Sequence, residues 1–275
     1  MIRTAARRRR ALLPAALSGL GLALAGAVFP VAAAEDVVYK EEPVKTQAPL
    51  PPGSAVAAFD PRSLTPLFPT GPLQQASERL RSGDAAGAAR MLAELSQQPA
   101  IAADIHARFL LALAQLRTAQ ANPTATESAA LAGRAAAHFD ALAASYPLLR
   151  SYHTLYAGRA YLLAGQAAVA LARAQAVPTD SVLDCEARFL VGEALRSSGS
   201  DDATRGRAVA AYRSFVAVCP HSRRLEAAQR QAELLDIIGR PAEALVIWRR
   251  LYLEAPHEPV GAQAAKRFDQ AAPTH

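Results

Sequence analysis

The feature that most constrains this chain is a spaced pattern of glycine, alanine, bulky apolar residues and proline near its C-terminal end. There Gly239, Ala244, Trp248, Leu251 and Pro256 stand at offsets 0, 5, 9, 12 and 17. Steps of three and four residues place the alanine and the bulky residues on one face of a helix, while glycine and proline mark its start and its stop. The spacing therefore predicts a helical hairpin whose two helices touch at the alanine.

The same spacing recurs upstream. The positions Ala208, Tyr212, Phe215 and Pro220 keep the offsets 0, 4, 7 and 12, with a longer turn in which we expect residues 200–206 to form a polar loop. Fainter copies are marked by Gly158, Tyr161, Gly165 and Ala170, by Ala135, Phe139, Leu142 and Pro147, and by Gly83, Ala88, Leu92 and Leu95. We expect hairpins over residues 73–99, 101–147, 151–178, 182–220 and 223–256, with a long helix over 101–119 and a final helix near 260–269.

These spacings resemble those of tetratricopeptide repeats. A single hairpin cannot bury its apolar face alone, so neighbouring hairpins must stack to form a continuous core. The resemblance implies an all-α fold over residues 73–270, a right-handed α-solenoid of about five hairpins with a concave inner wall. No alternating strand pattern competes with this interpretation.

The N-terminal residues predict an exported protein. Residues 1–34 combine the run Arg7 to Arg10, an apolar stretch and three alanines that end at Ala34, which is typical of a secretory signal peptide cleaved after that residue. An uncleaved membrane anchor is the alternative, against which several glycines and prolines in the stretch argue. Residues 35–72 contain eight prolines and are expected to form an extended linker. We therefore expect a periplasmic or otherwise exported protein that is not an integral membrane protein after cleavage.

Charge and composition exclude several classes of function. Five arginines precede residue 35 and no acidic residue does, so only +1 of the formal charge of +6 belongs to the rest of the chain. The rest of the chain is therefore nearly neutral and lacks the clustered basic residues that binding to nucleic acid requires. With two cysteines, no Cys-x-x-Cys motif and six scattered histidines, we expect neither a metal site nor a cofactor.

The two cysteines are expected to meet. In the repeat register Cys185 starts the first helix of its hairpin, while Cys219 ends the second helix just before Pro220. Antiparallel helices bring those ends together, and exported proteins fold under oxidising conditions, so a disulfide is predicted. The alternative is a pair of neighbouring buried thiols.

The register also predicts a binding face on the concave wall. Among the inward positions, the candidate binding residues are Tyr152, Leu155, Arg159, Phe189, Glu193, Arg196, Gln229 and Glu233. Mixed charge with two aromatic residues suits a protein or peptide partner in the groove, and a merely solvated wall is the alternative. Carboxylates on this wall could serve as a general acid only in a desolvated cleft, so no catalytic residue is assigned.

Two segments resemble the helical region of soluble lytic murein transglycosylases: the run from Tyr146 to Tyr161 and the turn over residues 177–183. That resemblance implies a link to peptidoglycan, but the family's catalytic domain carries a Glu-Ser-x-Phe motif. Here the pair Glu127-Ser128 is followed by two alanines. We therefore expect an exported, non-catalytic scaffold that binds a protein partner, peptidoglycan or its processing machinery. The alternatives are the repeat part of a transglycosylase whose catalytic domain is missing or on another chain, and an adaptor for envelope assembly or division.

Overall fold

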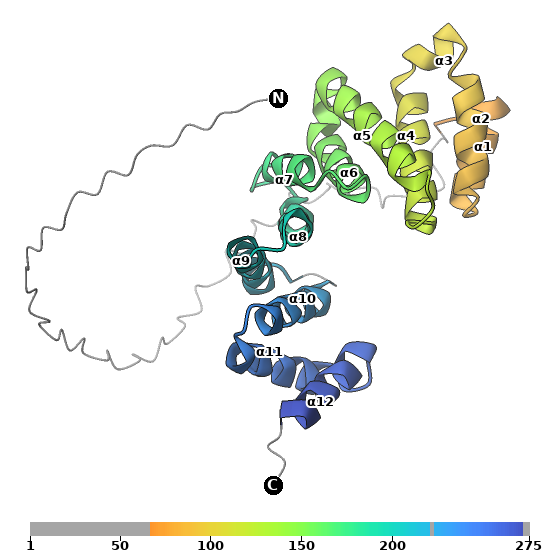
Figure 1. Ribbon diagram of the computed structural model, residues 1–275. Coiled ribbons are helices and arrows are strands. Elements are labelled where there is room, and N and C mark those ends of the chain that lie inside the picture. Colours follow the sequence, from red (N-terminus) through yellow and green to blue (C-terminus); the bar gives the residue numbers. More distant parts are fainter. Residues whose placement is uncertain (1–66, 221–222, 272–275) are drawn as a thin grey trace, which may run out of the picture. The chain divides into compact units, whose positions relative to one another are not determined.

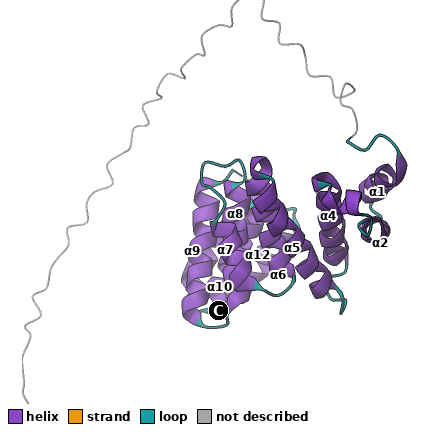
Figure 2. Cartoon of the chain, turned by 90° about the horizontal axis from the view of Figure 1, so that it is seen from above, coloured by secondary structure: helices purple, strands orange, loops and turns teal. Residues whose placement is uncertain are grey.

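The computed structural model describes residues 67–220 and 223–271, all within one compact unit that spans Asp60–His275. These described residues form twelve α-helices and one 3-10 turn, with no strand among them (Figures 1 and 2). The α-helices are α1 (Gly71–Arg81), α2 (Ala85–Leu95), α3 (Pro99–Ala103), α4 (Ile105–Ala121), α5 (Ser128–Ser145), α6 (Arg150–Leu163), α7 (Ala167–Gln175), α8 (Asp184–Ser198), α9 (Asp202–Val218), α10 (Arg224–Ile237), α11 (Pro241–Glu254) and α12 (Pro259–Ala271). The predicted all-α fold class is confirmed, whereas the predicted signal peptide and the linker up to residue 66 lie outside the described residues.

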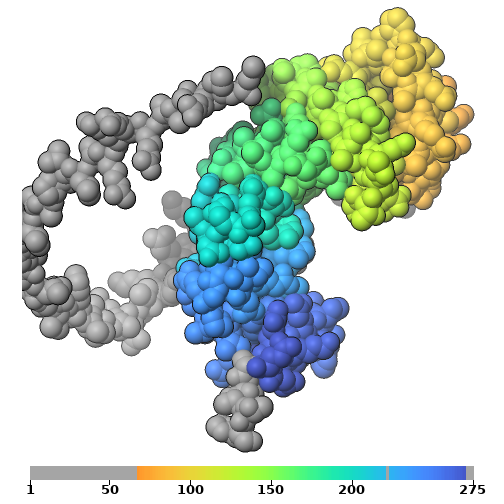
Figure 3. Space-filling model, viewed as in Figure 1, coloured from red at the N-terminus to blue at the C-terminus, as the bar shows by residue number. Residues whose placement is uncertain are grey.

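The helices pair into five hairpins, namely α1 with α2, α4 with α5, α6 with α7, α8 with α9, and α10 with α11. The second helix of each hairpin packs on the first helix of the next, and α11 packs on α12. Segments therefore contact their neighbours along the chain, as the ordered bands of colour in the space-filling view show (Figure 3). This is the arrangement of a helical solenoid, and the predicted number of hairpins is confirmed.

First helices also touch one another. The helix α6 contacts both α4 and α8, and α12 contacts α10, whereas no comparable contact joins two second helices within residues 67–220 and 223–271. The first helices therefore lie on the inner side of the stack. We call the exposed sides of α6, α8, α10 and α12 the inner face.

Three of the five hairpin turns share one construction. Each contains a glycine in the left-handed conformation: Gly83 with φ 93°, Gly165 with φ 76° and Gly239 with φ 73°. After each glycine, an amide closes the end of the preceding helix by a hydrogen bond to a carbonyl five residues back. These bonds are Asp84 N to Arg79 O (2.9 Å), Gln166 N to Tyr161 O (2.8 Å) and Arg240 N to Leu235 O (2.8 Å). A side chain would be strained at these positive φ angles, which explains why each of these three turns contains a glycine.

Small residues lie where the helices cross, as the spacing predicts. Ala208 and Ala244 are fully buried. At Gly192 the nearest atom of the Tyr212 ring lies 2.6 Å from the place that a Cβ would occupy, so only glycine lets α9 approach α8 this closely. Trp248 and Tyr212 are among the largest buried side chains of the core.

The predicted helix over residues 101–119 is wrong at its start. The structure has the short helix α3, then an extended residue, Asp104, and then α4. The Asp104 carboxylate accepts hydrogen bonds from the amides of His106 (2.7 Å) and Ala107 (3.0 Å). Asp104 therefore caps α4, because its side chain satisfies amides that a helix start leaves without a partner.

The prediction of a polar loop over residues 200–206 is also wrong, because α9 already begins at Asp202. The Asp201 side chain accepts a hydrogen bond from the amide of Thr204 (2.8 Å) and caps the helix. The extra residues therefore lengthen the second helix of this hairpin, and the connection itself comprises only residues 199–201.

The repeat region starts slightly earlier than predicted. The helix α1 begins at Gly71, two residues before the predicted boundary, and includes Pro72 in its first turn. Proline fits there because first-turn amides have no partner inside the helix. No helix among residues 67–220 and 223–271 is both long and apolar enough to cross a membrane.

Candidate binding groove

A groove with a volume of about 640 Å³ opens on the inner face between α6 and α8. Most of its lining residues come from the first helices of two consecutive hairpins, and Gln120 of α4 and Arg223 just before α10 complete the lining. Leu162 and Leu163 of α6 supply apolar surface opposite the charged residues of α8. The groove thus combines an apolar strip with charged groups along an exposed channel.

Four of the eight predicted inward residues line this groove together: Arg159, Phe189, Glu193 and Arg196. Tyr152 lies near the start of α6, 42% exposed, and does not line the groove. Gln229 and Glu233 lie further along the inner face, on α10.

Leu155 is a correction to the predicted face. It is only 2% exposed and packs in the core with Ala174, Ala187 and Leu190 from α7 and α8. The repeat register gives the direction of a side chain on its own helix, but the neighbouring hairpin covers this one. Leu155 therefore supports the groove from behind and cannot touch a ligand.

Phe189 lines the groove, although it is only 2% exposed. Its ring makes edge contacts with Tyr212 and Phe215, with centroids 6.0 and 5.5 Å away. The Arg223 guanidinium lies 3.6 Å from the Phe189 ring centroid and covers it. Phe189 is therefore the floor of the groove, and the cation above it is what a ligand meets.

The arginines of the groove are all paired with glutamates. Arg159 is hydrogen-bonded to Glu186, which joins α6 to α8. Within α8, Arg196 donates to Glu193 at 2.8 Å. Arg223 likewise donates to the carboxylate of Glu226, at 2.9 and 3.3 Å, and this set of pairs leaves the groove of mixed charge and close to neutral.

Glu193 is held in its charged form. Burial would raise the pKa of Glu193, but hydrogen bonds from Arg196 and Tyr212 and the charge of Arg230 outweigh it, so the pKa lies below its ordinary value. The Tyr212 hydroxyl donates to Glu193, and burial together with that carboxylate raises the pKa of Tyr212. A general acid needs the opposite shift. Glu193 therefore suits hydrogen bonding and not proton donation.

The inner face continues from α10 to α12 through a set of amide and carboxylate contacts. The Gln229 amide donates to Glu233 and to Gln263, both at 2.9 Å, and the Gln263 amide donates to Glu233 at 3.2 Å. Arg230 lies between Glu193 (3.8 Å) and Glu233 (3.6 Å). Sequence reasoning missed Gln263, because α12 follows the last hairpin in which the repeat spacing is recognisable.

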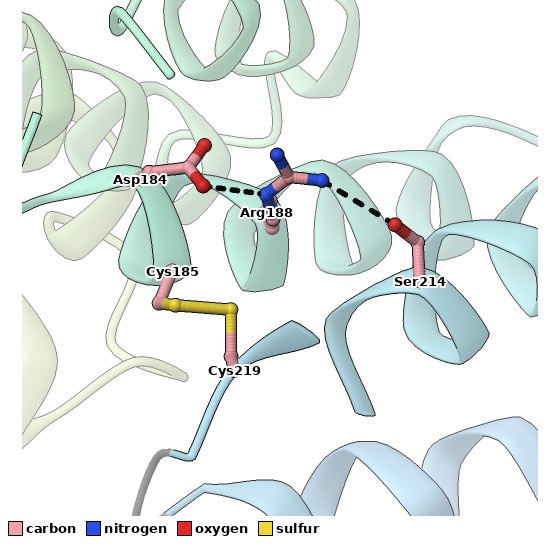
Figure 4. Close-up of a disulfide and its surroundings, with 5 residues drawn as sticks. All are labelled: Asp184, Cys185, Arg188, Ser214 and Cys219. Atoms are coloured by element: carbon pink, nitrogen blue, oxygen red, sulfur yellow. Dashed lines mark hydrogen bonds and ion pairs between the residues drawn. A yellow bond between two sulfur atoms is a disulfide. The ribbon is translucent and has the colours of Figure 1, made fainter. Parts of the chain in front are cut away.

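The predicted cysteine pair lies beside the groove. Cys185 in the first turn of α8 and Cys219 at the end of α9 are joined by a disulfide, with their Cα atoms 5.7 Å apart (Figure 4). Nearby, Arg188 donates to Asp184 at 2.7 Å and to Ser214 of α9 at 3.4 Å. Cys185 precedes Glu186, and Cys219 lies four residues before Arg223. The bond thus links the two chain segments that carry groove residues.

No group of three or more histidine, cysteine, aspartate or glutamate side chains within the described ranges could hold a metal ion. The groove offers paired guanidinium and carboxylate groups over an apolar floor, which suit recognition of another molecule.

The stacked hairpins form a tetratricopeptide-like helical-repeat fold. Among solved structures, the chain is similar in fold to one described as "MamA RS-1 ArsTM double mutant", with a TM-score of 0.50, 17% identity and coverage of 66% of this chain and 93% of that one. Two structures described as Podosopora anserina putative kinesin light chain nearly identical TPR-like repeats, one of them a substituted variant, align with TM-scores of 0.49 and 0.47. The first is 16% identical, and its alignment covers 67% of this chain and 92% of that one. The second is 17% identical, and its alignment covers 68% of this chain and 95% of that one. Neither the protein-family models nor the curated proteins compared with this sequence give a match. The likeness therefore concerns the fold alone.

Proposed function

We propose that this chain is a non-catalytic scaffold that holds an extended segment of a partner protein in the groove between α6 and α8. The observation that carries the proposal is the groove of about 640 Å³ itself, with the apolar residues Leu162 and Leu163 beside paired charges. An extended peptide places alternate side chains on opposite sides, so one set can cover the leucines. The other set and the peptide backbone can hydrogen-bond to Arg159 and Arg196. A segment of mixed charge with apolar anchors fits best.

The test fills the groove by substitution. Ser197 is exposed and lines the groove, so Ser197→Trp should block it while leaving every ion pair in place. Its neighbour Ser198 does not line the groove, which makes Ser198→Trp the matched control. Proteins from the envelope fraction of the source cells are cross-linked to each variant and quantified by mass spectrometry.

The scaffold proposal predicts that the unsubstituted protein and the Ser198→Trp variant cross-link the same partners. The Ser197→Trp variant should recover these partners in smaller amounts. A synthetic peptide from the cross-linked segment should then bind with a Kd at least about tenfold weaker for Ser197→Trp. Equal recovery with both tryptophan variants would show that the groove is not the binding site.

We further propose that the scaffold works in the cell envelope, on a partner that belongs to the peptidoglycan-processing machinery. Two features support this setting. Residues 1–34 have the layout of a signal peptide, and the pairing of Cys185 with Cys219 suits an oxidising compartment. The resemblance of residues 146–161 to lytic transglycosylases supplies the link to peptidoglycan.

A second candidate is the repeat part of a lytic transglycosylase whose catalytic domain is carried by another chain, which the same resemblance favours. The purified protein is incubated with peptidoglycan sacculi, and soluble products are identified by mass spectrometry. A non-catalytic scaffold should release no anhydro-muropeptides above a buffer control. Release by the protein alone would contradict the scaffold proposal, and release only after adding a cross-linked partner would favour the second candidate.

A further inference from the structure

A second groove, with a volume of about 420 Å³, lies between the second helices of the first two hairpins. Its walls are α2 and α5, and its floor is formed by Gln115 and Thr118 of α4. On α4 these two residues point about 140° or more away from Gln120, which lines the first groove, because each helical residue turns by about 100°. The two grooves therefore use different faces of α4.

The floor of this second groove contains an unsatisfied polar atom. Gln115 is only 6% exposed, and its side-chain oxygen has no hydrogen-bond partner among the described residues. The Thr118 hydroxyl donates its hydrogen bond to the carbonyl of Ala114 at 2.8 Å and so does not donate to Gln115. A buried acceptor without a partner is energetically unfavourable, so a ligand N–H that donates a hydrogen bond to this oxygen stabilises the complex.

The walls carry arginines that are free to pair with a ligand. Arg90 of α2 and Arg134 of α5 both line the groove and are exposed, and neither forms an ion pair with a residue of the described ranges. The lining contains one acidic residue, Glu127. Burial lowers the pKa of nearby His138, and the charges of Arg108 and Arg134 lower it further, as expected beside an excess of positive charge. The groove thus differs from the first one, where the arginines are paired.

The walls also let a peptide backbone come close. Three alanines of α2 face the groove, Ala86, Ala89 and Ala93, and their short side chains leave the floor accessible. The Gln115 oxygen itself is shielded from solvent, so the side-chain amide must turn towards the groove before a peptide N–H can reach it, whereas acidic side chains on the same peptide can reach the exposed guanidinium groups at the rim directly. Arginine recognises carboxylates with two parallel hydrogen bonds.

We propose that the groove between α2 and α5 is a second binding site, which takes an acidic segment of a partner polypeptide. Carboxylates of the segment pair with Arg90 and Arg134, while a backbone N–H donates to Gln115. The site shares no lining residue with the groove between α6 and α8, so the proposal goes beyond the proposed function and does not depend on it.

The test uses a fluorescein-labelled peptide of alternating glutamate and alanine, with glutamine in place of glutamate in its matched control. Binding to the purified full-length protein is followed by fluorescence anisotropy. The acidic peptide should bind with a Kd below about 1 mM, and the glutamine peptide should bind at least about tenfold more weakly. Raising the salt concentration should weaken binding, because the carboxylate contacts are exposed.

Variants locate the site. Arg90→Gln combined with Arg134→Gln should weaken binding at least about tenfold, and Gln115→Leu should weaken it severalfold, because one backbone contact is lost. Arg249→Gln removes an exposed arginine of α11 and should leave the affinity unchanged. Arg159→Gln with Arg196→Gln in the first groove should also leave it unchanged.

A steric variant keeps the test independent of charge and of the stability of the Gln115 variant. Ala93 is exposed and lines the groove, so Ala93→Trp should abolish binding, whereas Ala130→Trp, on an exposed part of α5 outside the lining, should not. Three outcomes would overturn the proposal: no binding of the acidic peptide up to about 1 mM, equal binding by the Arg90 and Arg134 double variant, or loss of binding only with the Arg159 and Arg196 variant.

Discussion

The fold favours the charged form of one polar side chain, Glu193, and the neutral form of another, His153, on neighbouring first helices. Glu193 of α8 is surrounded by Arg196, Tyr212 and Arg230, which keep its carboxylate charged. His153 of α6 is only 1% exposed, and neither ring nitrogen has a hydrogen-bond partner among the described residues. Burial lowers the pKa of His153, so the folded protein holds this imidazole neutral.

This difference predicts how stability depends on pH. The unfolded chain binds a proton at His153 near its ordinary pKa of 6.5, whereas the folded chain binds it only at lower pH. The free energy of unfolding should therefore fall as pH drops through 6.5 towards the folded-state pKa. The total loss is about 1.4 kcal/mol for each pH unit that separates the unfolded-state pKa of His153 from its folded-state pKa. Replacing the imidazole by His153→Leu should remove this loss and raise stability at every pH below neutral. Denaturation of both proteins from about pH 7 to about pH 5 measures the difference.

A gap between the His153→Leu variant and the unsubstituted protein that stays constant over this pH range would contradict the argument.

A second prediction concerns the close approach of α8 and α9. A Cβ at Gly192 would lie 2.6 Å from the Tyr212 ring, so Gly192→Ala must displace a buried ring that also holds Glu193. We expect a loss of about 1–3 kcal/mol in the free energy of unfolding. Gly206 in α9 has open space around it, so Gly206→Ala should stabilise by about 0.5–1 kcal/mol. Chemical denaturation compares the two, and destabilisation of equal size in both variants would refute the steric explanation.

At the scale of elements, hairpins of one design differ in how their ends are fixed. The hairpins that turn at Gly83, Gly165 and Gly239 close with the same backbone hydrogen bonds. The α8–α9 hairpin lacks such a glycine and instead begins α9 with the Asp201 cap. At its open end, the Cys185–Cys219 bond joins the start of α8 to the end of α9. This hairpin is therefore held at both ends by side chains.

The disulfide gives a prediction at this scale. Closing the chain between Cys185 and Cys219 should stabilise the folded protein by about 3 kcal/mol, mainly because it restricts the unfolded chain. Thiol titration of the native protein purified from its source cells, denatured without reductant, should find no free cysteine. Reductant should lower the denaturation midpoint of the unsubstituted protein but not that of the Cys185→Ala, Cys219→Ala double variant. Two free thiols in the titration would refute the bond.

At the scale of the whole molecule, contacts run mainly between neighbours along the chain, so each hairpin depends on the next for its buried surface. The final helix α12 covers the last hairpin and extends the inner face through Gln263. The two grooves lie at different places in this stack, between first helices in one case and between second helices in the other. The two proposed sites thus use different faces of one stack.

Export is the prediction that belongs to this scale. Cell fractionation should place the protein outside the cytoplasm, and its mature form should begin at Glu35. Mass spectrometry of the purified native protein reads that terminus directly. A Met1 terminus on protein recovered with the membrane would instead support an uncleaved anchor, the alternative for residues 1–34.

Much of the helical architecture could be read from local spacing. The positions of Gly239, Ala244 and Trp248 specify a turn, a helix contact and a buried core residue, and the structure has all three in those roles. The errors at Asp104 and Asp201 arose because a capping aspartate can start a helix inside what otherwise reads as a continuous helix or a polar loop.

The helical hairpins, their number and most of the turns between them could be predicted from sequence, because they depend on residues close together in the chain. Tertiary packing, in contrast, buries Leu155 and Phe189, pairs the arginines of one groove and leaves Arg90 and Arg134 of the other without an ion pair among the described residues. Those outcomes depend on how a neighbouring hairpin covers each helix. Repeat spacing describes one hairpin at a time, so it does not indicate which side chains the neighbouring hairpin buries.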